Sequence, residues 1–102
     1  MLTSDLKRIT SLIDIAARAI EVDDMDSRRR VDAEALKEAY KAWKAAKGVD
    51  NIDAHSPEWE AMVTATAGEY GVLQDTKRQV ANARKRLGTA IRKYRAAAGD
   101  GV

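Results

Sequence analysis

The sequence predicts an all-α protein, and three observations support this fold class. The chain has 102 residues, one proline and 33% charged residues, a composition typical of helices rather than of strands or disorder. Apolar residues recur at helical spacing along most of the chain, and helix-stop and helix-start residues flank a single polar loop near 48–56. At this length we expect one helical domain at 1–98 and a disordered tail at 99–102.

The first expected helix runs from about residue 4 to 22. Its apolar residues recur every three or four positions on one face, and Thr3 or Ser4 can cap its start. That face carries Leu2, Leu6, Ile9, Ile13, Ala16 or Ala17, and Ile20. The acidic run at 23–26 breaks the pattern, because Asp is poor inside helices and good at their caps. We therefore expect a turn there and a new helix from about residue 27.

The second expected helix runs from about 27 to 47 and has a strong stop signal. Lys44 and Lys47 lie near its negative end, and Gly48 follows at the position where a left-handed residue closes helices. After the loop, Ser56 and Pro57 have the residue types preferred at the cap and first position of a helix. The loop boundaries are therefore predicted from local chemistry alone.

The third expected helix runs from about 57 to 97 and carries an apolar heptad repeat. Gly68 and Gly71 weaken it, so a kink near these glycines is possible. We expect the first two helices to form a hairpin packed on this long helix. The candidate core or dimer seam comprises Leu36, Tyr40, Trp43, Trp59, Val63, Tyr70, Leu73, Val80, Leu87, Ile91 and Tyr94.

The core predicted by this pattern is thin. Alanine dominates the apolar residues, Phe is absent, and Trp and Tyr number only five together. Alanine buries little area, although Ala83, Ala90 and Ala97 suit a close approach of two helices. We therefore expect a homo-oligomer, most simply a dimer through the third helix.

The third helix has a strongly basic outer side. Residues 76–98 contain eight Lys or Arg and no acid. On a helical wheel these cations share an arc of about 200° opposite the apolar seam. They are Lys77, Arg78, Arg84, Lys85, Arg86, Arg92, Lys93 and Arg95. This basic arc suits non-specific contact with the phosphates of DNA or RNA, but it also fits a solvated face or cations neutralised by acids of the fold or of a partner subunit.

No pattern of catalytic or metal-binding residues is evident. His55 is the single histidine, cysteine is absent, and Asp50 and Asp53 are the only acids in the loop beside His55. We expect no enzyme activity, catalytic residue, metal, cofactor or small-molecule substrate. Charged residues interrupt the first 20 positions, so we expect neither a signal peptide nor membrane association, and a soluble cytoplasmic protein.

These observations predict a small non-catalytic helical binding protein that acts on another macromolecule as an inhibitor, adaptor or assembly factor. Small helical chains of phages and other mobile elements act in this way, which is an argument from analogy. A protein is the expected partner. The alternative is a non-specific nucleic-acid-binding protein that uses the basic arc.

Overall fold

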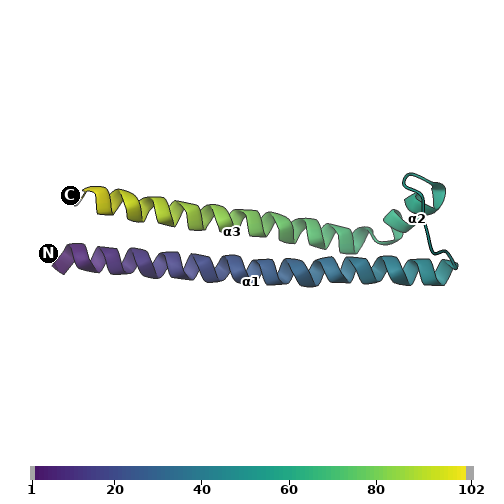
Figure 1. Cartoon of the computed structure of the whole chain (residues 1–102), viewed down its shortest axis with the longest axis horizontal. Coiled ribbons are helices and arrows are strands. Elements are labelled where there is room, and N and C mark those ends of the chain that lie inside the picture. The colour runs from purple at the N-terminus through teal and green to yellow at the C-terminus, as the bar shows by residue number, and fades with distance from the viewer. Residues whose placement is uncertain (1, 101–102) are drawn as a thin grey trace. The chain divides into compact units, whose positions relative to one another are not determined.

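The computed structural model describes residues 2–100, with side chains for 3–99, and this part of the chain is helical and without strands (Figure 1). Helix α1 spans Leu2–Lys47, α2 spans Pro57–Ala65, and α3 spans Ala67–Asp100. The all-α prediction is therefore confirmed. Of the expected tail at 99–102, positions 99 and 100 form the end of α3, and positions 101 and 102 lie outside the described residues.

Helix α1 is continuous where the sequence predicted two helices at 4–22 and 27–47 joined by a turn. Residues 21–30 are helical throughout, so the predicted hairpin of two short helices is wrong. An Asp inside a helix costs at most about 0.7 kcal/mol relative to Ala, which tertiary contacts readily offset. Two of the acids in this stretch, Glu21 and Asp26, meet arginines of α3 and thereby join the fold without a break in the helix.

The predicted third helix begins where expected but is divided at Thr66. Ser56 caps α2, since its hydroxyl accepts from the Trp59 N–H at 3.2 Å, and Pro57 is the first helical residue. At Thr66 the backbone leaves helical geometry, with φ −107° and ψ 15°, and its hydroxyl donates to the carbonyl of Met62 at 2.8 Å. The interruption lies two residues before Gly68, near the kink that the sequence indicated, and both Gly68 and Gly71 lie inside α3.

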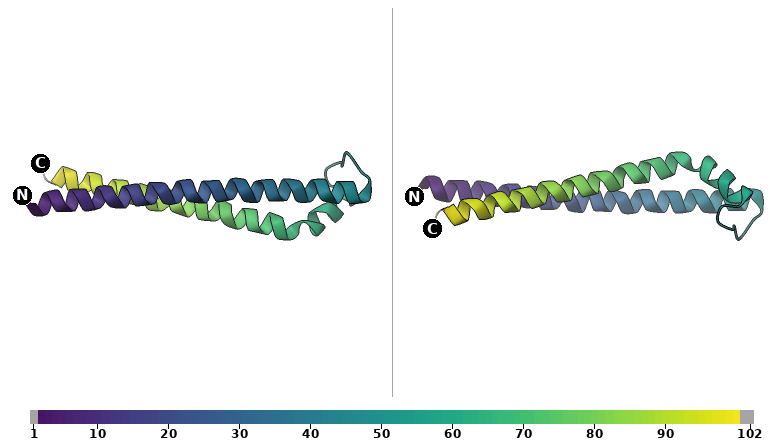
Figure 2. Two further views of the ribbon diagram at one scale, coloured as in Figure 1. Left: turned by 90° about the horizontal axis from the view of Figure 1, so that it is seen from below. Right: turned by 90° about the horizontal axis from the view of Figure 1, so that it is seen from above.

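The chain divides into two compact units, which we call the terminal unit (residues 1–27 and 78–102) and the loop unit (residues 28–77). In the terminal unit the first half of α1 runs antiparallel to the second half of α3 (Figures 1 and 2). The buried apolar residues of the terminal unit are Val80, Ala83 and Ala90, all on α3. Their small side chains permit the close approach of backbones that the sequence predicted for Ala83 and Ala90.

The loop unit gathers its core from three helices. Its buried residues are Leu36 of α1, Met62 of α2, Leu73 of α3, and two threonines, Thr66 and Thr76. The Thr76 hydroxyl donates to the Asp32 carboxylate, which ties α3 to α1. Gly48 adopts φ 68° directly after α1, as its position in the sequence predicted.

We predict that Ala83→Leu destabilises the protein by about 1–3 kcal/mol, because Ala83 is fully buried and a larger side chain would force α1 and α3 apart. The matched control is Ala81→Leu, an exposed position on the same helix, which should change stability by no more than about 0.5 kcal/mol. Urea unfolding followed by circular dichroism measures both. Equal effects of the two substitutions would contradict the close packing at Ala83.

Candidate functional site

Most residues of the predicted core or dimer seam are buried or half-buried. Leu36, Leu73 and Val80 are buried, and Tyr70 is 50% exposed. The remaining members are half-buried: Tyr40, Trp43, Trp59, Val63, Leu87, Ile91 and Tyr94. Of these eleven residues only Tyr70 is exposed, so little of the seam is left as a surface for a partner.

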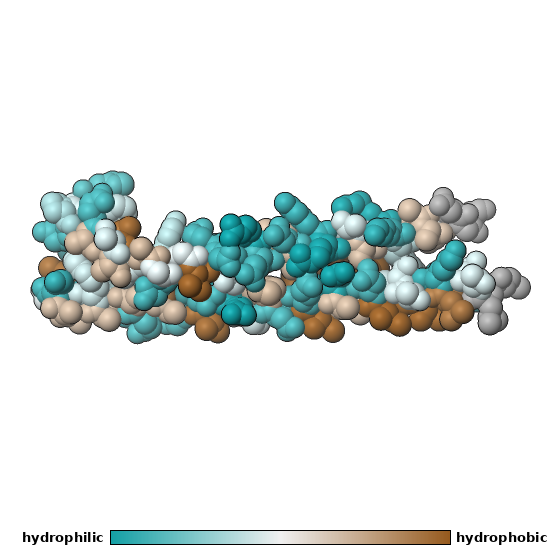
Figure 3. All heavy atoms as spheres, turned by 180° about the vertical axis from the view of Figure 1, so that it is seen from behind, coloured by the Kyte–Doolittle hydropathy of each residue, from teal (hydrophilic) through white to brown (hydrophobic). Residues whose placement is uncertain are grey.

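The exposed large aliphatic side chains described in the terminal unit form a row on α1, which we call the outer stripe. Its members are Leu6, Ile9, Leu12, Ile13 and Ile20, exposed by 58%, 52%, 48%, 64% and 62% respectively. At about 100° per residue they occupy an arc of about 120°. Figure 3 shows apolar surface collected along this part of α1. The stripe therefore forms one apolar face of α1, with the small Ala16 and Ala17 between Ile13 and Ile20.

Helix α1 turns a different, more polar face inward. In the terminal unit the half-buried residues of α1 include the apolar Ile15, Val22 and Met25. The polar Ser11 and Arg18 are half-buried on the same face. The apolar face that the sequence predicted for the first helix shares Leu6, Ile9, Ile13 and Ile20 with the outer stripe, so the predicted face is the exposed one. The spacing of Ile15, Val22 and Met25 by seven and three positions is the signal that could have identified the inward face.

All eight members of the basic arc are exposed, and the arc divides into paired and unpaired cations. Arg86 contacts Glu21 of α1 through Nη2 at 2.6 Å and Nε at 2.7 Å, and Arg84 lies 4.0 Å from Asp26. Acids of the fold thus neutralise part of the arc, one of the alternatives that the sequence left open. Among the side chains described, none forms an ion pair with Lys77, Lys85, Arg92, Lys93 or Arg95.

His55 packs against an aromatic ring rather than gathering acids. Its ring centroid is 4.9 Å from that of Trp59, at an interplanar angle of 56°, and its backbone has φ 65°. Asp50 lines a shallow groove whose other lining residues lie within 41–49. Neither His55 nor Asp53 lines this groove. Within residues 3–99 no three His, Asp or Glu side chains are grouped as metal ligands would be.

Comparison of the chain with protein-family models, with curated proteins and with solved structures finds no match. Over the described residues, none of the helices combines the length and the apolar character needed to cross a membrane. Among the described residues, the outer stripe and the unpaired cations of the basic arc are exposed and contact no other part of the fold through an ion pair.

We predict a small, salt-sensitive coupling between Glu21 and Arg86. Both side chains are partly exposed, at 32% and 47%, so the pair should contribute no more than about 1 kcal/mol. A double-mutant cycle with Glu21→Gln and Arg86→Gln should show this coupling at low salt and lose most of it at about 1 M salt. A cycle of Glu21→Gln with Lys85→Gln serves as the control and should show none. Absence of coupling at low salt in the first cycle would disprove the pairing.

Proposed function

We propose that this chain is a small non-catalytic binding protein that acts through contact with another protein chain, as an inhibitor, adaptor or assembly factor, and that it binds through the outer stripe. The observation that carries the proposal is the exposure of five large aliphatic side chains, by 48–64%, on one face of α1. Single exposed aliphatic residues are ordinary on protein surfaces, but a continuous row of them marks an interaction site.

The energetics of the stripe favour a partner that brings an equal apolar surface. Full burial of one aliphatic side chain contributes about 1.5–3 kcal/mol, so burial of the exposed parts of the five contributes about 4–8 kcal/mol. Association of two chains costs roughly 4–15 kcal/mol in lost translational and rotational freedom. One stripe against a polar surface would barely cover that cost. Two stripes packed together would contribute about twice as much, which supports a stable complex.

A second copy of the chain supplies such a surface, so we propose that the chain bound by the outer stripe is a second copy, in a homodimer through α1. Positions 6, 9, 13, 16 and 20 are separated alternately by three and four residues, which is the spacing of the contact residues in two helices packed side by side. In an antiparallel pair whose two-fold axis crosses α1 at the level of residue 11, on the outer face, Ile9 of one copy lies opposite Ile13 of the other. In the same alignment Leu6 lies opposite the small Ala16, so large and small side chains complement each other.

The homodimer is tested by Ile13→Asp. Because Ile13 is 64% exposed within the chain, this substitution should leave helicity and the melting temperature of the monomer nearly unchanged. It places a charge in the middle of the proposed interface, so we expect the dimer dissociation constant to rise at least about a hundredfold. Sedimentation equilibrium measures it. The control is Val72→Asp on α3, which is 54% exposed and outside the stripe, and should leave dimerisation intact.

A monomeric wild-type chain at concentrations of about 100 μM would refute the homodimer, because the stripe would then be insufficient for self-association. A dimer that forms equally well with Ile13→Asp would show that another surface holds the two copies together.

A second candidate function is non-specific binding of nucleic acid by the unpaired part of the basic arc. Lys85, Lys93 and Arg95 are exposed on α3 and form no ion pair with the side chains described at 3–99. The terminal unit also contains ten Lys or Arg against seven Asp or Glu. Exposed cations of this kind neutralise phosphates and release counterions without reading bases.

Fluorescence anisotropy of a labelled random duplex tests this second candidate. We expect affinity to fall by at least tenfold between about 50 and 200 mM salt, and to be lost in Lys85→Glu/Lys93→Glu. The control is Lys37→Glu/Lys47→Glu, which removes two exposed lysines of the loop unit and should retain most of the binding. No binding of the wild-type protein at the lower salt would rule this function out.

A further inference from the structure

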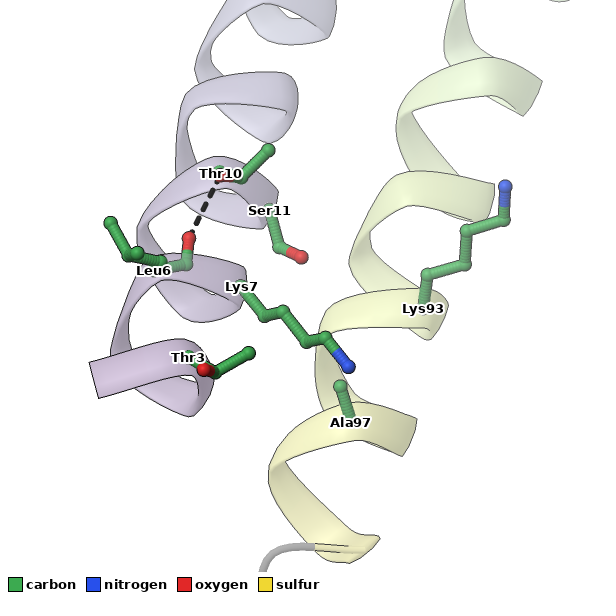
Figure 4. A pocket seen from close by; sticks show the side chains of 7 residues that line it. All are labelled: Thr3, Leu6, Lys7, Thr10, Ser11, Lys93 and Ala97. Atoms are coloured by element: carbon green, nitrogen blue, oxygen red, sulfur yellow. Dashed lines mark hydrogen bonds between the residues drawn. The ribbon is translucent and has the colours of Figure 1, made fainter. Parts of the chain in front are cut away.

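The terminal unit contains an open groove of about 480 Å³ between the start of α1 and the end of α3. Lys7 and Ser11 line it from α1, and Lys93 and Ala97 line it from α3 (Figure 4). The small side chain of Ala97 leaves the space between the two helices unfilled. The groove therefore results from two opposing walls rather than from a single helix surface.

The charge of this groove is one-sided. Its lining contains two ammonium groups, from Lys7 and Lys93, and no carboxylate. Neither lysine forms an ion pair with any side chain in the described range 3–99. In Figure 4 Lys7 extends across the groove toward Ala97, while the amino group of Lys93 points away from it. Their flexible stems allow both ammonium groups to approach a common ligand, whose negative charge would offset their repulsion.

Hydroxyl groups add hydrogen-bond donors to the same walls. Ser11 is half-buried, and its hydroxyl has no partner among the described residues and faces the space between the helices in Figure 4. Thr10 differs, because its hydroxyl already donates to the Leu6 carbonyl at 2.8 Å. Ammonium and hydroxyl donors without a competing carboxylate suit a ligand that only accepts hydrogen bonds, which is the chemistry of a phosphate group.

We propose that this groove binds a small phosphate monoester. Lys7 and Lys93 contact the phosphate oxygens from opposite walls, and the Ser11 hydroxyl donates a third hydrogen bond. A volume of about 480 Å³ is within the range of small-ligand sites and exceeds what a lone phosphate ion occupies. The organic part of the ester therefore fills the remainder of the groove between the two walls. This site adjoins the outer stripe, because Leu6 belongs to the stripe and also lines the groove.

The experiment is an NMR titration of the full-length protein with ribose 5-phosphate and, separately, with inorganic phosphate, at constant ionic strength. We expect saturable shifts of backbone amides in residues 3–11 and 93–97, and a dissociation constant at least threefold lower for the ester. Shifts spread over both units, or no saturable shift, would overturn the site. Equal affinity for both ligands would overturn its assignment to a monoester.

Two variants distinguish specific binding in this groove from non-specific electrostatic attraction of anions to the protein. Lys7→Gln/Lys93→Gln should weaken binding of ribose 5-phosphate at least tenfold, whereas Lys37→Gln/Lys47→Gln, with the same loss of charge in the loop unit, should not weaken it more than twofold. Ala97→Leu keeps every charge but fills the groove, and should also weaken binding at least tenfold. Unchanged binding in either groove variant, with helicity retained, would overturn the proposal.

Discussion

A pair of helices shares a single line of contact, and this constraint governs the terminal unit. There α1 and α3 have only each other to pack against, so each can bury one narrow face. Val80, Ala83 and Ala90 occupy that face on α3, while none of the described α1 residues at 3–27 is buried. The aliphatic row of α1 consequently remains in solvent, and the cations of α3 divide between those that reach acids of α1 and those that do not.

The parts of the fold predicted correctly depend on local chemistry. The end of α1 at Gly48 and the start of α2 at Ser56 and Pro57 follow from the conformational preferences of these few residues. The continuity of α1 could not be predicted in the same way. Arg86 meets Glu21 from 65 positions away, and such a distant contact decides whether an acidic stretch turns or stays helical.

The sequence predicts the residues of one candidate surface but not their exposure. The apolar row from Leu6 to Ile20 can be recognised by its spacing, but its exposure depends on which of two rows of α1 faces α3. The spacing of Ile15, Val22 and Met25 marks the second row in the sequence, but the contact with α3 decides which of the two rows is covered. The groove at Lys7 and Lys93 was missed for the same reason, because the two lysines are 86 positions apart in the sequence and only the antiparallel pairing brings them to one site.

Helix α2 has nine residues and one buried side chain, Met62. Helices shorter than about 12 residues do not persist alone in water, so α2 keeps its form through its capped ends and its contact with the rest of the loop unit. Local opening of residues 49–66 therefore requires far less free energy than separating α1 from α3. Amide hydrogens of α2 should exchange with solvent through such openings while those at the centre of α1 stay protected, which makes this segment the preferred place for a protease to enter the chain.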